Sequence, residues 1–364
     1  MKMQVFTLFL SALTNLLIIK LAEDHKKMVG DNNFDGPQKI HTDVIPRIGG
    51  AALITAISAS IGISYIFFSE HIPELLLLIL CSLPAFISGL ADDISKNVPP
   101  KIRMLWIVVS ALMVVIFFRI EISTTNIGIL DSILDNKIIS ILFIIFSITG
   151  LTNAYNIIDG VNGLSSMIGI ITLASIGFTA YLVNDHNLVI LCLSMSSALF
   201  GFFIFNYPRG LVFLGDCGAY LIGFWVATCT WLLISRNNEI TIWYGLLVNI
   251  YPTIETIFTI YRRRKGGIRK ISKPDGLHFH TILYKRYFRP KLSSDYKILA
   301  TYKNSKIAPL FWIFTLLSCT VAILFRYSQI GSFITIALFI LMYTKSYSMV
   351  VRFEIPKIRY KKLK

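Results

Sequence analysis

The chain has 364 residues and a formal net charge of +15, and 55% of its residues are hydrophobic while only 15% are charged. With a mean hydropathy of +0.67, this composition excludes a soluble globular domain and predicts a polytopic membrane protein. Neither a disulfide framework nor a zinc site is indicated, because the five cysteines stand singly in or beside apolar runs. They are Cys81, Cys192, Cys217, Cys229 and Cys319.

Eleven apolar runs are long enough to cross a bilayer as helices. In chain order they cover residues 3–22, 48–69, 74–91, 104–118, 138–155, 164–183, 187–205, 211–234, 240–260, 308–325 and 330–348. The first run lacks a small-x-small cleavage site, so we interpret it as a helix and not as a signal peptide. The predicted fold class is therefore all-α: a polytopic integral membrane protein with about 11 transmembrane helices, forming one membrane-embedded domain over residues 1–364.

The distribution of basic residues predicts the orientation of these helices. Of the 35 Lys and Arg residues, only five fall on one side, namely Lys2, Arg119, Lys137, Arg236 and Arg326. By the positive-inside rule that side is external, with the N-terminus outside and the C-terminus cytoplasmic. The net charge is thus a topology signal and does not indicate nucleic acid binding, although a basic face attracts anionic headgroups and phosphorylated substrates.

Polar clusters interrupt the apolar pattern only on the predicted cytoplasmic side. Burying ionisable groups next to hydrocarbon is costly, so such clusters are candidates for a functional site. Their confinement to one face predicts a single active site at the inner membrane surface. The loops that carry them are 23–47, 92–103, 156–163, 206–216 and 261–307.

The stretch NAYNIIDGVNGL, residues 153–164, is the densest of these clusters. If the preceding run is helical, Asn153, Asn156 and Asp159 recur every third residue and share one arc of its surface. Gly160 and Gly163 then allow a turn or the close approach of a ligand. An Asx-rich turn at a helix end would explain this stretch alone, but the recurrence of similar clusters on the same side favours a functional site.

Four carboxylates on separate segments are predicted to converge there: Asp92, Asp93, Asp159 and Asp216. Proteins hold Mg²⁺ with one or two carboxylates together with substrate phosphates, and nearby cations bind phosphate. A metal that bridges phosphate oxygens is the usual apparatus of phosphoryl transfer. Because the site faces the cytosol at the lipid boundary, one reactant could be a soluble nucleotide and the other a lipid phosphate.

Five short motifs lie in or beside the predicted cytoplasmic loops: PRxGG from Pro46, DDxxK from Asp92, NxxDGxxGL from Asn156, FLGDxG from Phe213 and HxH from His278. In their order and spacing, these motifs together resemble the polyprenyl-phosphate N-acetylhexosamine-1-phosphate transferase family, also called glycosyltransferase 4. The similarity covers residues 35–285 and favours the branch that initiates surface glycans, to which the phospho-MurNAc-pentapeptide transferase is related.

The resemblance implies a reaction and its participants. A phosphate oxygen of undecaprenyl phosphate attacks the β-phosphorus of a UDP-N-acetylhexosamine, UMP leaves, and a lipid-linked sugar pyrophosphate results. Mg²⁺ is the implied cofactor, with Mn²⁺ as the alternative cation. The implied location is the bacterial inner membrane, where relatives often form homodimers. Neither the sugar nor the glycan pathway is encoded by any of these motifs.

The resemblance also implies roles for individual residues. Asp216 is the expected metal ligand, while Asp92, Asp93 and Asp159 are expected to be catalytic. Asp92 would deprotonate or position the lipid phosphate. The expected substrate-binding residues are Lys39, His41, Arg47, Lys96, Asn153, Asn156, Asn206, Arg262, His278 and His280.

Each of these assignments has a plainer alternative. Many relatives have a second acid where this chain has Asn162, which puts a charge or nucleotide contact at that position in doubt. Asp216 could be a helix N-cap, and the two histidines could be surface residues of their loop. Glu255, a turn or two from the arginines at 262–264, is interpreted as half of a structural intramembrane ion pair.

Two other functions fit the composition. The first is the peptidoglycan enzyme, phospho-MurNAc-pentapeptide transferase, although the DGLHFH loop is closer to the surface-glycan branch. The second is a secondary transporter, which would show internal repeats and polar groups near the bilayer midplane. Here the acids stand at predicted helix ends on one face, which favours the transferase.

Overall fold

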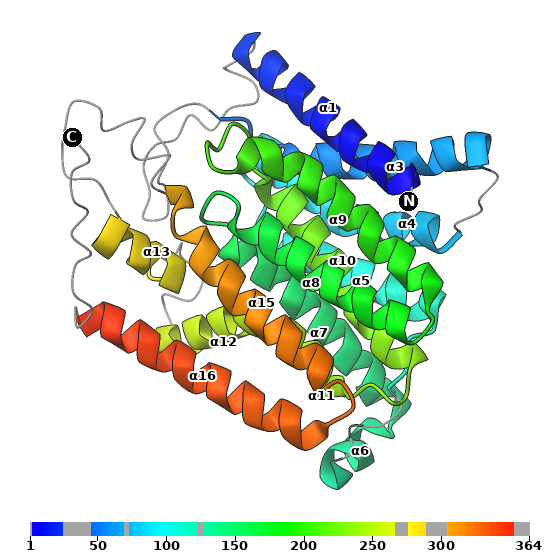
Figure 1. The fold of residues 1–364 in the computed structure, drawn as a ribbon, viewed down its shortest axis with the longest axis vertical. Coiled ribbons are helices and arrows are strands. Elements are labelled where there is room, and N and C mark those ends of the chain that lie inside the picture. Colours follow the sequence, from blue (N-terminus) through cyan, green and yellow to red (C-terminus); the bar gives the residue numbers. More distant parts are fainter. Residues whose placement is uncertain are drawn as a thin grey trace.

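The structure is a computed structural model, and it describes residues 2–24, 45–68, 73–122, 125, 127–265, 276–288 and 304–352. Every regular element within these residues is a helix (Figure 1). Eight helices are long and apolar enough to cross a membrane, so the all-helical, multi-pass prediction is confirmed. They are α1 (Lys2–Asp24), α4 (Pro73–Ser95), α5 (Pro100–Phe118), α7 (Lys137–Ile158), α8 (Leu164–Leu182), α9 (His186–Asn206), α10 (Gly215–Arg236) and α16 (Gln329–Arg352).

The remaining predicted runs form helices outside this set of eight. Two of them contribute the apolar helices α3 (Gly49–Phe68) and α15 (Ala308–Leu324). The predicted run 240–260 is divided into α11 (Ile242–Val248) and α12 (Ile250–Lys265). Pro252 explains the break, because its ring would clash with the carbonyl of Val248 in a continuous helix. Within the described residues there are also three small elements: α6 (Gly128–Leu134), α13 (Phe279–Leu283) and the π-helical turn η2 (Tyr284–Phe288).

Helix α10 lies at the centre of the bundle, where its apolar segment is fully buried. It contacts α3, α4, α5, α7, α8 and α9. Glycines allow two of these neighbours to meet its first turn backbone to backbone: a Cβ at Gly50 would collide with Gly218, and a Cβ at Gly89 would collide with Cys217. Small residues at helix contacts are the usual means of close packing in membranes. The ends of α3 and α4 are thereby held against the start of α10.

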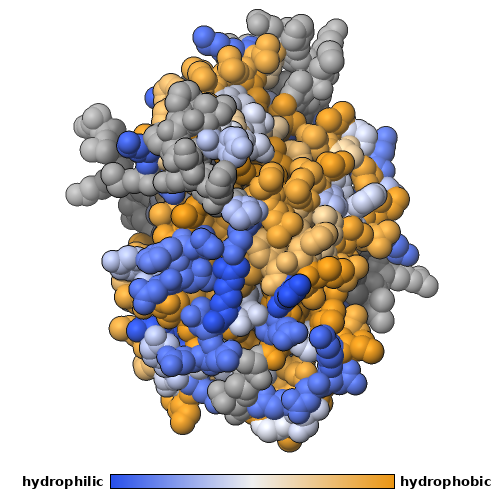
Figure 2. Space-filling view, turned by 90° about the vertical axis from the view of Figure 1, so that its right-hand side faces the viewer, coloured by the Kyte–Doolittle hydropathy of each residue, from blue (hydrophilic) through white to orange (hydrophobic). Residues whose placement is uncertain are grey.

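Large apolar side chains cover the outside of the bundle. Examples are Phe146, which is 74% exposed, Phe9 and Leu341. Figure 2 shows one face on which hydrophobic residues form a broad area beside a smaller hydrophilic region. Exposed apolar area on this scale is the surface that hydrocarbon chains cover. All five cysteines are buried and free, as the sequence predicts.

An ion-pair network around Arg236, at the end of α10, connects the helices at the end of the bundle opposite the first turn of α10. Its guanidinium lies 2.9 Å from Glu74 Oε2, at the start of α4, and 3.3 Å from Asp185 Oδ2. Asp185 also caps α9 by accepting a hydrogen bond from the backbone N–H of Leu188. Since α10 has 22 residues, this network stands about 33 Å from the first turn of α10 at 1.5 Å per residue.

Candidate active site

Asp93 fixes the start of α10. Its two carboxylate oxygens accept hydrogen bonds from the backbone N–H groups of Asp216 and Cys217, each at 2.9 Å. These N–H groups belong to the first turn of a helix, which has no internal partners for them and favours an anion. Asp93 therefore supplies the cap from α4, and the alternative that Asp216 is itself the cap is wrong.

The side chain of Asp216 instead joins the acids to two arginines. Arg103, in the first turn of α5, forms ion pairs through one nitrogen with Asp216 Oδ2 and, at 2.8 Å, with Asp92 Oδ2. Arg47 lies 3.7 Å from Asp216 Oδ1, and the backbone N–H of Val98 donates to Asp92 Oδ1 at 3.1 Å. Three helices and the segment before α3 thus bring their charged groups to one point.

Arg103 is a candidate functional residue that the sequence reasoning missed. The loop containing it was predicted to be part of the site, but no role was given to the residue. The signal was available in the helical hairpin: α4 ends at Ser95 and α5 begins at Pro100. Such a short connection makes the helices antiparallel neighbours, so the first turn of α5 faces the last turn of α4.

Asp159 ends helix α7 as its C-cap residue. Burial raises the pKa of its carboxyl group to about 7; Arg47 opposes this shift, and the charges of Asp216 and Asp93 reinforce it. A carboxyl group with such a pKa can exchange a proton near neutral pH. The three charged groups that influence the pKa of Asp159, namely Arg47, Asp216 and Asp93, all belong to the ion-pair and capping contacts described above. Asn156 lies half-buried in the last turn of the same helix.

The turn after Asp159 is held by amide side chains. Asn206 is buried; its Oδ1 accepts from the backbone N–H of Gly163 at 2.6 Å, and its Nδ2 donates to the carbonyl of Val212 at 2.8 Å. The indole of Trp312, on α15, donates to the carbonyl of Gly163 at 3.0 Å. Asn206 was predicted to bind substrate, and the structure gives it hydrogen bonds that connect this turn to the segment leading into α10.

The histidine segment packs onto the same turn from the other side. His278 precedes α13 and His280 lies within it, with ring planes 6° apart and centroids 5.6 Å apart. Their exposed fractions are 5% and 1%, so the alternative that they are surface residues is wrong. A Cβ at Gly160 would lie 2.7 Å from His280 Nε2. Burial lowers the pKa of His280 to about 4. The charge of Glu255 opposes this shift, and the charge of His278 adds to it.

Five other predicted site residues either lie outside the described residues or stand in or beside helices α4, α7 and α12. Lys39 and His41 lie outside the described residues. Lys96 is exposed at the end of α4 with a φ of 56°, and the ion pair of Asp92 is formed with Arg103. Asn153 is half-buried on α7, and Arg262 is half-buried in the last turn of α12.

Glu255 does not point along α12 as the predicted ion pair with the arginines would require. Its Oε1 accepts from the backbone N–H of Phe279 and lies 3.3 Å from His278 Nδ1, while its Oε2 accepts from the hydroxyl of Tyr343. The carboxylate is therefore directed at the histidine segment. Sequence spacing could not predict these contacts, because they join three distant parts of the chain.

The described residues contain no group of three or more His, Cys, Asp or Glu side chains arranged to hold a metal ion. Two carboxylate oxygens, Asp92 Oδ2 and Asp216 Oδ2, nevertheless meet at one nitrogen of Arg103. Their shared position already accommodates a cationic group. A pair of carboxylates is enough for Mg²⁺, which usually takes one or two of them and completes its shell with water and phosphate oxygens.

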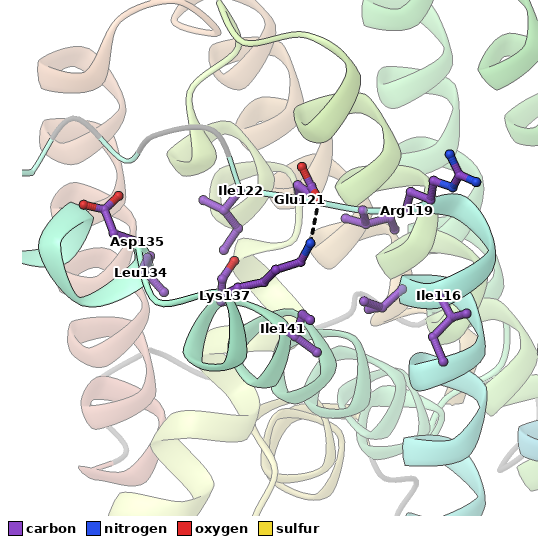
Figure 3. Close-up of a pocket in the computed structure, with 11 residues that line it drawn as sticks. Ile116, Arg119, Glu121, Ile122, Leu134, Asp135, Lys137 and Ile141 are labelled. Carbon is purple, nitrogen blue, oxygen red and sulfur yellow. Dashed lines mark ion pairs between the residues drawn. The ribbon is translucent and has the colours of Figure 1, made fainter.

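A separate cavity of about 630 Å³ lies between α5, α6 and α7, far from the acids. It is lined by Arg119, at the end of α5, and by Lys137, which begins α7 and reaches to within 3.6 Å of Glu121 (Figure 3). The site residues occupy the opposite ends of α5 and α7, so this cavity takes no part in the cluster.

Gly215 is the position where the packing around Asp216 is least tolerant. Its φ is +75°, and a Cβ there would collide with the carbonyl of Arg47 and the carboxylate of Asp93. We expect Gly215→Ala to lower the free energy of unfolding by about 2 kcal/mol through overpacking and backbone strain, measured as thermal unfolding in detergent. Gly150→Ala is the matched control, because nothing lies within 4 Å of its added Cβ; equal stability of the two variants would contradict the prediction.

Comparison with known proteins agrees with this geometry. Residues 75–234 match glycosyl transferase family 4. The chain is 26% identical over 294 residues to the undecaprenyl-phosphate alpha-N-acetylglucosaminyl 1-phosphate transferase of Salmonella typhi, covering 78% of this chain and 75% of that protein. For the enzyme of the same name from Escherichia coli strain K12, the identity is 23% over 282 residues, covering 75% and 74%.

A second group of relatives matches over a shorter stretch. The phospho-N-acetylmuramoyl-pentapeptide-transferase of Streptococcus mutans is 29% identical over 119 residues, which are 30% of this chain and 33% of that protein. The matched range 75–234 contains Asp92, Asp93, Asp159 and Asp216, the helices from α5 to α9 and all but the outermost residues of α4 and α10. Residues 75–234, which carry these four carboxylates, are therefore the part of the chain that is similar to glycosyl transferase family 4.

Proposed function

We propose that this protein transfers a sugar 1-phosphate from a UDP-N-acetylhexosamine to undecaprenyl phosphate, releases UMP, and so begins the synthesis of a lipid-linked surface glycan. The observation that carries the proposal is the meeting of Asp92, Asp216 and Arg103 at one end of a membrane-sized bundle. The names of the relatives that match three quarters of the chain support the same acceptor and the same kind of reaction.

The cluster suits a reaction between two phosphates. Asp92 and Asp216 would hold Mg²⁺ between them, with the donor pyrophosphate completing the coordination. When bound, the ion would offset the negative charge that develops on the transferred phosphoryl group. Arg103 and Arg47 would bind phosphate oxygens once the carboxylates are engaged, because guanidinium groups match phosphate geometry. Asp93 would keep the first turn of α10, and with it Asp216, in place.

The chemical step itself is a displacement at phosphorus. An oxygen of the acceptor phosphate forms a bond to the β-phosphorus of the donor, and the bond from that phosphorus to the bridging oxygen of UMP breaks. Asp92 would take the proton from a protonated acceptor phosphate or orient the phosphate for attack. Asp159, whose pKa is about 7, can exchange a proton within the cluster. Asn156 would contact the nucleotide.

We propose that this cluster lies at the cytoplasmic surface of the inner membrane, on the side that the basic residues predict to be cytoplasmic. There the donor arrives from the cytosol and the acceptor arrives within the bilayer. Two observations support this arrangement: the polar cluster stands at helix ends, and the ion pairs of Arg236 stand at the opposite ends of α4 and α10. We also propose that the protein forms a homodimer.

UMP release by the purified protein tests the proposal. We expect release only when undecaprenyl phosphate, Mg²⁺ and the correct UDP-N-acetylhexosamine are all present, and we expect removal of Mg²⁺ by EDTA to stop it. Asp92→Asn and Asp216→Asn should each lower release at least about 100-fold, the usual cost of losing one charged group that stabilises a transition state. No release with any donor, from protein that is folded, would refute the transferase assignment.

The peptidoglycan reaction is the second candidate, and the same assay decides between the two. The shorter match to phospho-N-acetylmuramoyl-pentapeptide-transferases supports this second candidate. UMP release with UDP-MurNAc-pentapeptide alone would assign the protein to that reaction. Release with one N-acetylhexosamine donor would identify the sugar, which no residue of the described cluster specifies.

A further inference from the structure

Glu255 is a buried carboxylate that the proposed reaction does not use. It is 1% exposed, and an ionised group in such a position needs several hydrogen-bond donors. Its three neighbours provide them: the backbone N–H of Phe279 at 3.0 Å, the Nδ1 of His278 at 3.3 Å and the hydroxyl of Tyr343 at 2.9 Å. Two of these belong to the histidine segment 276–288, and the third belongs to the last helix.

Helix α16 binds the same segment at further points along its length. The hydroxyl of Tyr347 donates to the carbonyl of Leu277 at 3.1 Å, and the guanidinium of Arg286 donates to the carbonyl of Val350 at 2.6 Å. The rings of Phe279 and Tyr343 pack edge to face at 5.3 Å. Figure 1 shows α13 beside the C-terminal part of α16. The position of the segment therefore depends on α12 and α16 together.

This position determines how the histidines meet the proposed donor site. His280 packs on Gly160, next to Asp159, and its Nδ1 lies 3.4 Å from the hydroxyl of Tyr251 on α12. The carboxylate of Glu255 at Nδ1 of His278 fixes the orientation of that ring, as carboxylates commonly do for functional histidines. A shift of the segment would move His280 away from the turn that follows Asp159, together with the His278 ring that stacks on it.

We propose that Glu255 and Tyr343 are positioning residues, which hold the stacked pair of His278 and His280 so that His280 lies against the turn after Asp159 and the rings can bind the pyrophosphate of the donor. This inference rests on the proposed function. It gives the last helix a role in the reaction, although α16 contributes no group to the carboxylate cluster. It also explains why an ionisable side chain is kept inside the protein, where an apolar residue of similar size would pack without a desolvation cost.

Chemical modification of histidines tests the positioning independently of activity. Diethyl pyrocarbonate reacts with accessible imidazoles, and mass spectrometry gives the rate at each residue of the intact protein in detergent. His186 is exposed and serves as the internal standard. In Glu255→Gln and Tyr343→Phe we expect His278 and His280 to react about tenfold faster relative to His186, the change produced by losing roughly one strong hydrogen bond.

Turnover is measured on the same variants. We expect kcat for UMP release to fall about tenfold in Tyr343→Phe, with Glu255→Asp retaining more activity than Glu255→Gln. The matched control is Tyr244→Phe, which removes a buried tyrosine hydroxyl bonded to Thr179 at 2.9 Å, away from the site. It should lower thermal stability to a similar degree while leaving kcat and the two histidines unchanged.

The two readouts separate the possible failures. Unchanged histidine reactivity in both Glu255→Gln and Tyr343→Phe would refute the positioning role, whatever the activity. Exposed histidines with unchanged kcat would refute their part in binding the donor. If kcat fell as much in Tyr244→Phe as in Tyr343→Phe, the loss of stability would explain the loss of kcat, and the proposal would also be refuted. Absence of UMP release from the unsubstituted protein would instead refute the proposed function, while the modification rates would still report on the contact.

Discussion

Substitution of Arg103 by Gln is expected to lower UMP release by about 100-fold, the effect of removing one charged group aimed at the reacting centre. Arg103 is the only described residue that forms ion pairs with both Asp92 and Asp216. Without it, two carboxylates from different helices lose their common cation, and the phosphates lose a donor. Initial rates with saturating Mg²⁺ and both substrates measure the effect.

Two variants make this experiment specific. Arg103→Lys keeps the charge on a shorter side chain without the guanidinium fork, so its activity should fall between those of the native and Gln proteins. Lys101→Gln removes a cation two residues earlier on the same helix, from a side chain that is exposed, and should change the rate less than about twofold, as surface charges usually do. Arg103→Gln with a rate near that of Lys101→Gln would show that Arg103 only links the helices.

The helices were predictable because hydropathy reports the surroundings of each residue. A run of about 20 apolar residues has to form its backbone hydrogen bonds internally in a membrane, and α4, α7 and α10 begin and end close to the predicted limits. The run 240–260 was wrong as one helix because hydropathy does not register the steric effect of Pro252. A single proline there produces two helices, α11 and α12.

The meeting of Asp92, Asp93 and Asp216 was predictable in outline, because all three were expected at helix ends on one side. The different contact that each of these carboxylates makes was not predictable. In the last turn of α4, adjacent carboxylates point in different directions: Asp93 caps α10, and Asp92 faces Arg103. The sequence DD does not indicate which carboxylate caps α10 and which one pairs with Arg103. That assignment depends on the angle and rotation between α4 and α10, which glycine contacts set.

The residues that were missed share a different property. Arg103 and Tyr343 stand in ordinary helical sequence, and their importance comes from partners far away in the chain, such as Asp216 and Glu255. A motif records residues that are close in sequence. Long-range partners become visible only when packing brings them together, so the support of the histidine segment by α16 could not be predicted from the sequence.

Asn162 occupies the position where the family resemblance predicts an acid, and its surroundings explain why an amide suits this chain. It is 4% exposed; its Nδ2 donates to the carbonyl of Pro208 at 3.3 Å, and its backbone N–H donates to Asn304 Oδ1 at 3.3 Å. Gly210, at a φ of +64°, packs directly against its side chain. A carboxylate would have no proton to give to Pro208 and would place negative charge against that carbonyl.

We therefore expect Asn162→Asp to lower the free energy of unfolding by about 3 kcal/mol, because it buries a charge whose neighbouring donor, Asn304 Nδ2 at 3.5 Å from Asn162 Oδ1, is a neutral amide. Asn162→Ala loses the hydrogen bond but buries no charge, so its loss should be smaller, about 1 to 2 kcal/mol. Thermal unfolding in detergent, with all variants in the same buffer, gives the order of stability. Native protein should be the most stable and Asn162→Asp the least.

Asn238→Asp is the matched control, since it makes the same chemical change at an exposed residue and should alter stability by less than about 0.5 kcal/mol. The order of the two variants at position 162 is what decides the role of the residue. If Asn162→Asp were as stable as the native protein and released UMP faster, position 162 would face the donor and an acid there would contribute to the reaction. If it unfolds first, the amide is a structural part of the turn after Asp159, and the charge at that position has been exchanged for hydrogen bonds to Pro208 and Asn304.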